Sequence, residues 1–236
     1  LATDTGRWSI SVGEVDAAMR NIRRWAKQAP ELVRETEFES SLLPTVTIRD
    51  QFVPYGLVGC ISPWNFPVTL SLIDAVPALV AGCAALVKPS EVTPRCIAPL
   101  RRALERVPEL AAVFAFVTGG ADTGRALVGV VDVICFTGSV PTGRRVAEAA
   151  AARFIPAFLE LGGKDPAVVL ASADLEMATD VALRGSIANN GHACMSLERI
   201  YVQRPLYARF VSRLVEKARA VPLAWPDPRK GYLGPL

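Results

Sequence analysis

Short apolar runs alternate with helical segments through the central part of the chain. The runs are rich in Val, Ile and Ala and show no apolar–polar alternation, which is typical of strands buried on both faces of a sheet. Helices between such strands predict right-handed crossovers over a parallel sheet. We therefore expect a doubly wound α/β unit, with strands at residues 57–61, 84–87, 112–117 and 131–136 and helices at residues 68–81, 94–107, 123–128 and 142–152.

The flanking regions carry weaker patterns. Residues 12–34 are amphipathic and predict a surface helix to Gln28, with a second helix after Pro30. Residues 45–53 alternate between apolar and polar positions, which indicates a half-exposed strand at an edge or in a hairpin. Beyond Gly162-Gly163, the predicted domain boundary, we expect strands at residues 166–170 and 199–202 and helices at residues 172–189 and 206–218. No closing strand follows, so we expect the sequence to be incomplete at both ends.

Composition and charge exclude several classes of protein. A chain of 236 residues with 51% hydrophobic side chains can bury a sizeable core, which excludes disorder, collagen and coiled coil. The 26 basic and 23 acidic residues are scattered and give a net charge of +3, so we expect no nucleic-acid partner. Five cysteines without paired spacing and a single histidine indicate reduced thiols, a cytoplasmic setting and no metal site.

No export signal is visible in the sequence, and one segment has the length of a membrane span. Residues 68–87 are apolar except for Asp74. A charge near the centre of a spanning helix costs about 3 kcal/mol on insertion scales. Pro77 also interrupts the segment, and Gly82 is typical of a helix C-cap before a buried strand. We therefore predict a buried segment of a soluble protein and no membrane partner.

Loops at the carboxyl ends of the predicted strands are the first places to look for chemistry, because open α/β sheets bind ligands there. In the SPWNFP loop, Asn65 is either a structural amide or a donor to a developing oxyanion. In the KPSE loop, Lys88 and Glu91 either form a solvated turn or bind ribose hydroxyls and nearby phosphate.

Glycine-rich turns follow two further strands. Residues 137–143 carry two glycines and two hydroxyls and open a helix near Thr142, which fits a seat for a pyrophosphate. Gly119, Gly120 and Gly124 mark a similar strand-to-helix turn. The sequence has no G-x-G-x-x-G, so spacing alone leaves a dinucleotide site one possibility among others.

Cys194 is the candidate nucleophile. It lies in the short loop N-N-G-H-A-C between a predicted helix and a predicted strand, where local dipoles can favour a thiolate. His192 is too close in sequence to orient a Cys–His hydrogen bond, so a protease-like dyad is disfavoured and the base is expected to be Glu160 in E-L-G-G-K. The other four cysteines fit inert core thiols: Cys60, Cys83, Cys96 and Cys135.

Five motifs occur in one order along the chain: SPWNFP, KPSE, FTGS followed by Gly, ELGGKDP, and NNGHAC with Arg199 five residues later. In order and spacing they resemble the NAD(P)-dependent aldehyde dehydrogenase superfamily, whose members are longer than this chain. The resemblance is close over residues 53–202, and Gly234-Pro235 is similar to a further family element. It implies a NAD-binding domain at residues 1–161, with an assembly hairpin near residues 43–56, and the start of an α/β catalytic domain at residues 162–236.

The resemblance also implies a role for each matching residue. Cys194 attacks the aldehyde carbonyl to give a thiohemiacetal, and Asn65 and the Cys194 backbone N–H form the oxyanion hole. Transfer of hydride to the nicotinamide leaves a thioester, and Glu160 activates the water that hydrolyses it to a carboxylic acid. No metal is implied, and the cofactor groove comprises Ile61, Ser62, Pro63, Trp64, Asn65, Lys88, Ser90, Glu91, Gly120, Gly124, Phe136, Gly138, Ser139, Leu161 and Gly162.

Several finer expectations follow from the same match. A carboxylate at Glu91 favours NAD over NADP, because it repels a 2′-phosphate; NADP is the alternative. Two positions depart from the family pattern, since His192 stands where most relatives carry Gln and Asp74 where many carry Lys. The resemblance implies a small aldehyde substrate and a homodimer or homotetramer at full length. Glu160 disfavours acylating and reductive relatives, and an inert truncated chain that retains cofactor or partner binding is the remaining alternative.

Overall fold

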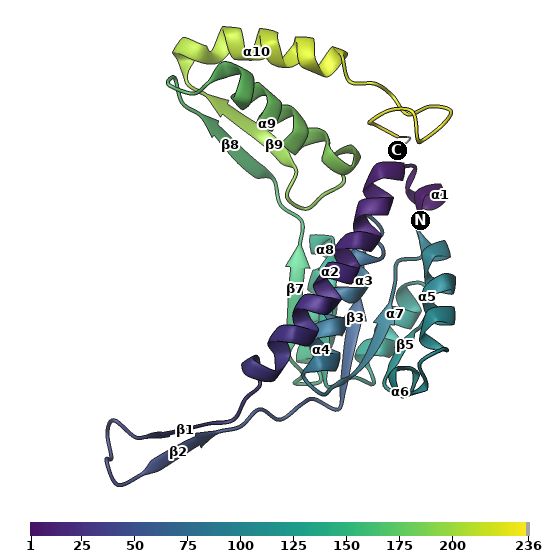
Figure 1. Cartoon of the computed structure of the whole chain (residues 1–236), viewed down its shortest axis with the longest axis vertical. Coiled ribbons are helices and arrows are strands. Elements are labelled where there is room, and N and C mark those ends of the chain that lie inside the picture. Colours follow the sequence, from purple (N-terminus) through teal and green to yellow (C-terminus); the bar gives the residue numbers. More distant parts are fainter. Residues whose placement is uncertain (235–236) are drawn as a thin grey trace. The chain divides into compact units, whose positions relative to one another are not determined.

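The computed structural model describes residues 1–234, which form two compact units (Figure 1). We call residues 14–137 and 141–159 the sheet unit, and residues 1–13, 138–140 and 160–234 the terminal unit. The two units meet in sequence near the predicted boundary, but the first 13 residues group with the terminal unit. The functional assignment of the two domains stays a prediction. Of the element Gly234-Pro235, Pro235 lies outside the described residues.

A five-stranded sheet in the order β5-β4-β3-β6-β7 forms the centre of the sheet unit. β3 pairs in parallel with β4 and with β6, and β4 pairs in parallel with β5. The chain therefore enters the sheet at β3, adds strands on one side and then returns to the other side, which confirms the predicted doubly wound topology. The strands are β3 (Leu57–Ile61), β4 (Ala84–Lys88), β5 (Phe114–Phe116), β6 (Val133–Gly138) and β7 (Ala157–Leu161).

Short helices connect these strands, and two of the predicted helices are interrupted. The helix predicted at residues 68–81 breaks at Ile73 and Asp74, because Pro77 has no N–H and its ring crowds the carbonyl four residues earlier. The helix predicted at residues 94–107 is likewise divided. The bounds are α3 (Thr69–Leu72), α4 (Ala75–Val80), η1 (Pro94–Cys96), α5 (Ile97–Leu104), α6 (Pro108–Ala111), α7 (Ala121–Val128) and α8 (Val140–Ala151).

Helix α2 (Trp8–Leu32) differs from its prediction, since it continues through Pro30 and no second helix follows. Pro30 lies in the last turn, where it removes only one backbone donor. Beyond the helix, β1 (Thr36–Glu39) and β2 (Thr47–Asp50) form an antiparallel hairpin. The strand expected at residues 45–53 is therefore shorter, and the hairpin begins before residue 43.

The terminal unit is built on a parallel pair of strands, β8 (Asp165–Val169) and β9 (Leu197–Val202). Helices α9 (Leu175–Ile187) and α10 (Arg204–Arg219) pack on each other and on β9. Asp174 caps α9 by accepting a hydrogen bond from the Met177 N–H at 2.7 Å, as the sequence indicates. The short helices α1 (Ala2–Thr5) and η2 (Ala188–Gly191) complete the unit, and its core contains Val169, Ala182, Leu206 and Phe210.

The apolar stretch at residues 68–87 is not a single helix. It folds as α3, α4 and β4, and Gly82 has a φ of 92° between α4 and β4, which agrees with its expected role at the helix end. Within residues 1–234, no helix combines the length and apolar character that crossing a membrane requires.

Candidate functional site

The predicted cofactor residues converge at the carboxyl ends of the central strands. β3 is the strand at which the order of the sheet reverses, because β4 lies on one side of it and β6 on the other. Ile61 at the end of β3 is directly opposite Lys88 of β4 and Phe136 of β6. Three motifs that are far apart in sequence therefore begin side by side, at the switch point where open α/β sheets bind ligands.

Lys88 and Glu91 form an ion pair at this edge. The Lys88 side chain is only 6% exposed, and its Nζ donates to Glu91 Oε2 at 3.0 Å and to the Pro89 carbonyl at 3.2 Å. The pKa of the Glu91 carboxyl is lowered, first by a backbone hydrogen bond and then by Lys88. The Glu91 side chain is 61% exposed. In the KPSE motif, therefore, the buried ammonium group of Lys88 holds the exposed carboxylate of Glu91. The motif is not a fully solvated turn.

Hydrogen bonds join the loops that follow β3 and β4. The Ser62 N–H donates to the Lys88 carbonyl at 3.1 Å, and the Ser62 and Ser71 hydroxyl oxygens are 2.7 Å apart. Thr93 Oγ1 donates to the Trp64 carbonyl at 3.1 Å. These hydrogen bonds connect the two loops into one structure. The predicted groove residues that it contains are Ile61, Ser62, Pro63, Trp64, Asn65, Lys88, Ser90 and Glu91.

Helix α7 approaches the same edge through Gly124. A Cβ atom at this position would lie 3.7 Å from Ile61 Cδ1 and 3.8 Å from Lys88 Cδ. Gly120 is the N-cap of this eight-residue helix and is exposed, with no atom within 4 Å of an added Cβ. Gly124 therefore belongs with Ile61 and Lys88, and Gly120 leaves the helix N-terminus open to solvent.

The FTGS motif differs from its prediction in one respect. Helix α8 begins at Val140, so Thr142 and Gly143 are helical, and Gly143 is buried. Pro141 in the first turn explains the early start, because its fixed φ suits that position. The predicted pyrophosphate loop is therefore shorter than residues 137–143. Four predicted cofactor residues belong to the terminal unit: Gly138, Ser139, Leu161 and Gly162.

Cys194 is exposed in a loop with an unusual backbone conformation. Asn189, Asn190 and Gly191 have consecutive positive φ angles of 56°, 58° and 75°. Asn and Gly adopt this left-handed conformation at the least cost, so N-N-G in the sequence favours the turn. Asn189 is buried, and its Nδ2 donates to the His192 carbonyl at 2.9 Å. This turn connects α9 to the segment that carries the exposed thiol.

Two residues at the ends of the described chain hold this turn. Arg7 is buried, and its Nη1 donates to the Asn189 carbonyl at 3.1 Å. The Gly234 N–H donates to Asn190 Oδ1 at 3.2 Å. The pKa of His192 is lowered, mainly by burial and further by the charge of Arg7. Sequence reasoning missed Arg7, because an arginine close to an amphipathic helix is normally a solvent-exposed group.

Glu14 is a second residue that sequence reasoning missed. It is buried on α2, and its Oε1 accepts hydrogen bonds from the N–H groups of Val68 at 2.7 Å and Thr69 at 2.9 Å. It therefore fixes the start of α3, directly after the SPWNFP loop. Nothing in the sequence separates Glu14 from the acidic residues on the exposed side of the same helix.

The three predicted catalytic residues do not all lie in one unit. Glu160 is exposed near the end of β7 and belongs to the terminal unit, as does Cys194. Asn65 is half-buried and belongs to the sheet unit. The roles of all three residues stay predictions.

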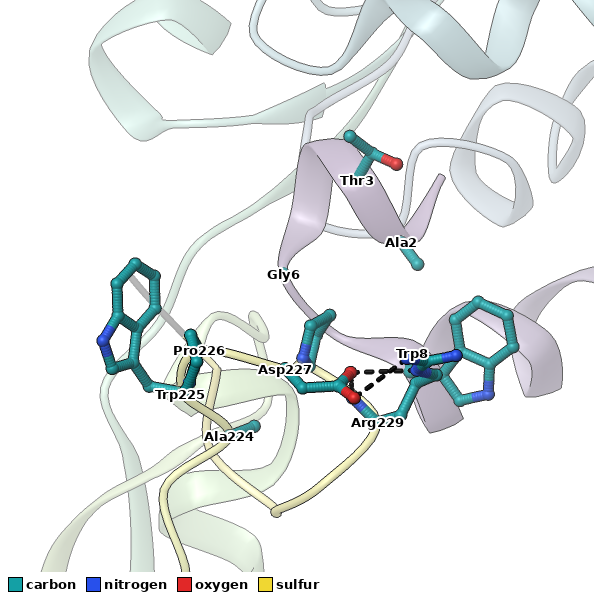
Figure 2. Close-up of a pocket in the computed structure, with 10 residues that line it drawn as sticks. Ala2, Thr3, Gly6, Trp8, Ala224, Trp225, Pro226, Asp227 and Arg229 are labelled. Atoms are coloured by element: carbon teal, nitrogen blue, oxygen red, sulfur yellow. Dashed lines mark hydrogen bonds and ion pairs between the residues drawn. The ribbon is translucent and has the colours of Figure 1, made fainter.

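The terminal unit also contains a pocket of about 440 Å³ (Figure 2). Trp8, Trp225 and Pro226 give the pocket an apolar lining. Asp227 and Arg229 form an ion pair at 2.9 Å beside it, and this contact lowers the pKa of Asp227 to about 2. None of the residues predicted for catalysis or cofactor binding lines the pocket.

A metal centre was not expected, and the described part of the chain offers no cluster for one. Over residues 1–234, His, Cys, Asp and Glu side chains form no group of three or more that could hold a metal ion. All five cysteines are free thiols, and Cys194 is the one that is exposed.

Comparison with known proteins gives consistent matches. The sequence model described as "Aldehyde dehydrogenase family" matches residues 2–236. A Mycolicibacterium smegmatis protein named for succinate-semialdehyde dehydrogenase [NADP(+)] activity is 39% identical over 217 residues, which are 92% of this chain and 42% of that protein. A Methylomonas protein named 4,4'-diapolycopene aldehyde oxidase is 38% identical over 222 residues, covering 92% of this chain and 41% of that protein.

Solved structures agree with the sequence matches. A structure from Anabaena variabilis named for aldehyde dehydrogenase has a TM-score of 0.97 and 54% identity, over 100% of this chain and 50% of that chain. Lactaldehyde dehydrogenase from Escherichia coli has a TM-score of 0.92 and 31% identity, over 99% of this chain and 50% of that chain. The chain therefore spans about half the length of these relatives.

Proposed function

This chain belongs to the aldehyde dehydrogenase family, and from that premise we propose that it carries the nucleophile, the base and the cofactor groove of an enzyme that oxidises an aldehyde to a carboxylic acid with NAD(P). The observation that carries the proposal is the convergence of Ile61, Lys88 and Phe136 at the switch point of the sheet. An exposed cysteine beside an ordered turn supplies the second requirement, a nucleophile that a substrate can reach.

The residues at the switch point fit a nicotinamide dinucleotide. The Lys88 ammonium and the Glu91 carboxylate provide a donor and an acceptor for ribose hydroxyls. The open N-terminus of α7 at Gly120 suits a phosphate, and Gly124 keeps this helix in contact with Ile61 without a side chain over the edge. When bound, NAD(P) supplies the oxidising power by accepting a hydride.

Cys194 begins the proposed reaction. Its Sγ attacks the aldehyde carbonyl carbon, and negative charge develops on the carbonyl oxygen as the thiohemiacetal forms. The Cys194 N–H and the Asn65 side-chain amide donate hydrogen bonds to this oxygen. The Asn189–Gly191 turn, held by Arg7, orders the backbone that precedes the nucleophile.

Glu160 completes the proposed reaction. After oxidation the acyl group is bound to Cys194 as a thioester, and the Glu160 carboxylate takes a proton from a water molecule whose oxygen attacks the acyl carbon. The tetrahedral species collapses, the C–S bond breaks, and the carboxylic acid leaves with the Cys194 sulfur free for another cycle. Exposure of Glu160 gives its carboxylate access to water.

Other features of the proposal concern cofactor, partners and setting. NAD is the preferred cofactor because of the exposed Glu91 carboxylate, although the Mycolicibacterium smegmatis relative has NADP(+) in its name. The substrate is a small aldehyde, and the full-length protein is a homodimer or homotetramer. The proposed compartment is the cytoplasm, where a nucleophilic thiol such as Cys194 stays reduced.

The decisive experiment measures NADH formation by this chain with NAD and a panel of aldehydes that includes succinate semialdehyde and lactaldehyde. The Cys194→Ser variant should lose all turnover, whereas Cys83→Ala, which removes a buried thiol outside the site, should retain it. Binding of NAD without turnover in the unmodified chain would favour the inert-chain alternative. A folded chain that neither binds NAD nor turns over substrate would contradict the cofactor assignment.

A further inference from the structure

Two thiols lie beside each other beneath the switch point. Cys60 of β3 and Cys135 of β6 are direct partners in the parallel register of the two strands. Neighbouring strands are about 4.8 Å apart. This separation lies within the range of about 4.4 to 6.8 Å that Cα atoms of a disulfide adopt. The sheet therefore holds the two thiols at a separation that a disulfide can bridge, although both are reduced in this structure.

The two thiols have different surroundings. Cys60 is 2% exposed, and its pKa is raised by the neighbouring Cys135 side chain, by burial and by the negative charge of Asp74. Cys135 is half-buried. An oxidant from solvent therefore reaches Cys135 first, and Cys60 remains a neutral thiol directly opposite it on the adjacent strand.

We propose that Cys60 and Cys135 are a modification site, at which a peroxide converts the two thiols into a reversible intramolecular disulfide. In the first step the Cys135 sulfur attacks a peroxide oxygen, the O–O bond breaks, and Cys135 sulfenic acid and water form. In the second step the Cys60 sulfur displaces the hydroxyl of the sulfenic acid, which leaves as water with the Cys60 proton. The thiols lose two hydrogens and two electrons, and one hydrogen peroxide becomes two waters.

The position of the pair gives the disulfide a consequence for binding. Cys60 directly precedes Ile61, and Cys135 directly precedes Phe136, so both lie next to predicted cofactor residues. A sulfur–sulfur bond of about 2.05 Å is shorter than any contact between two unbonded thiols, so its formation pulls the two strand ends together. We expect the oxidised chain to bind NAD more weakly. This consequence, unlike the disulfide itself, rests on the proposed function.

The test uses the folded chain with two substitutions. Cys83→Ala removes the second thiol of the tryptic peptide that carries Cys60, and Cys194→Ser removes the exposed nucleophile. The chain is treated with hydrogen peroxide, alkylated without reductant and digested with trypsin. We expect a linked pair of peptides, residues 50–95 carrying Cys60 and residues 126–144 carrying Cys135, which separates on treatment with dithiothreitol. The further substitution Cys135→Ala should abolish the linked peptide, and Cys96→Ala, a buried thiol elsewhere, should leave it unchanged.

The outcomes separate the modification from the proposed function. The proposal is overturned if peroxide leaves Cys60 alkylatable after unfolding, or if Cys135 proceeds to sulfinic acid with Cys60 still a thiol. NAD affinity is measured on the same oxidised and reduced samples. A linked peptide in a chain that binds no NAD in either state would support the disulfide and contradict the proposed function. Equal NAD affinity in the two states would refute the effect on binding.

Discussion

Glu91 is the residue through which the chain is expected to distinguish NAD from NADP. Its lowered pKa keeps the carboxylate ionised at neutral pH, and the side chain is largely exposed beside Lys88. In Glu91→Gln, the ratio of the NAD and NADP dissociation constants should shift about fivefold towards NADP, because surface charge interactions are worth up to about 1 kcal/mol. Calorimetric titration measures this without turnover. Glu105→Gln, at an exposed site after α5, is the control, and an unchanged ratio in Glu91→Gln would show that the carboxylate does not discriminate.

Arg7 tests how far the nucleophile loop depends on a residue distant in sequence. Arg7→Met removes the donor to the Asn189 carbonyl and should lower the free energy of unfolding by about 1 to 3 kcal/mol. It should also change the rate at which iodoacetamide alkylates Cys194, because the preceding turn loses a support. Arg7→Lys retains a cation and should lie between the two. Alkylation at the original rate in all three chains would mean that the turn is ordered without Arg7.

Gly119 and Gly120 are adjacent glycines with different constraints. Gly119 has a φ of 153°, and an added Cβ would collide with the Thr123 side chain, whereas Gly120 has open space around it. Gly119→Ala should therefore lower the free energy of unfolding by about 1 to 3 kcal/mol, through backbone strain and displacement of Thr123. Gly120→Ala should change it by less than about 0.5 kcal/mol. Urea denaturation measures both, and similar losses in the two variants would contradict the difference.

At the scale of elements, α9 and α10 are joined by a surface ion network. Glu176 of α9 binds Arg213 at 2.8 Å and Lys217 at 3.1 Å on α10, and Arg213 chiefly lowers the Glu176 pKa from 4.5 to about 2. A depressed carboxyl pKa stabilises the fold above its ordinary value, and this stabilisation is lost as the pH falls from about 4.5 towards 2.

Glu176→Gln should therefore lower the melting temperature at pH 6, and the difference from the parent chain should shrink as the pH approaches 2. Thermal unfolding followed by circular dichroism between pH 2 and pH 6 measures the two curves. Added salt should reduce the difference at pH 6, because the pair is exposed and screened. A difference that is constant with pH would exclude an ionic origin.

The elements also show where sequence patterns are sufficient. β3, β4 and β6 were predicted close to their observed bounds, because buried parallel strands are continuous apolar runs. β1 was missed, since all four of its side chains are exposed and no apolar alternation marks it. β7 was missed as well, because none of its side chains is fully buried and it contains the charged Glu160. The helix after the SPWNFP loop was expected to be continuous, because its apolar pattern runs on across Pro77, and in the structure it is interrupted at Ile73 and Asp74.

At the scale of the whole molecule, the hairpin of β1 and β2 provides a test of assembly. Phe38 is 49% exposed, and Leu42 in the connecting turn is 88% exposed. Exposed apolar side chains on one short hairpin are typical of an interaction surface. We expect the chain to self-associate, and the double substitution Phe38→Ser and Leu42→Ser to shift it towards monomer. Light scattering after size-exclusion chromatography measures the mass, with Glu39→Gln as the control. If the unsubstituted chain is already a monomer, the hairpin does not mediate self-association.

Sequence by itself determined the central strands, the doubly wound order and the motifs that lie at the ends of those strands. These features follow from local chemistry: β-branched runs form buried strands, prolines and glycines set turns, and N-N-G favours a left-handed turn before Cys194. The family could be identified for the same reason, because its motifs are contiguous stretches of sequence.

Tertiary structure alone decided which distant residues meet. Arg7 reaches Asn189, Glu14 caps α3, and Cys60 lies beside Cys135, yet none of these pairs is close in sequence. Whether an arginine or glutamate is buried, and whether a thiol has a partner, depends on which strand or loop packs against it. A one-dimensional pattern records the chemistry of each side chain, and only the pairing of strands and the packing of helices determines its neighbours.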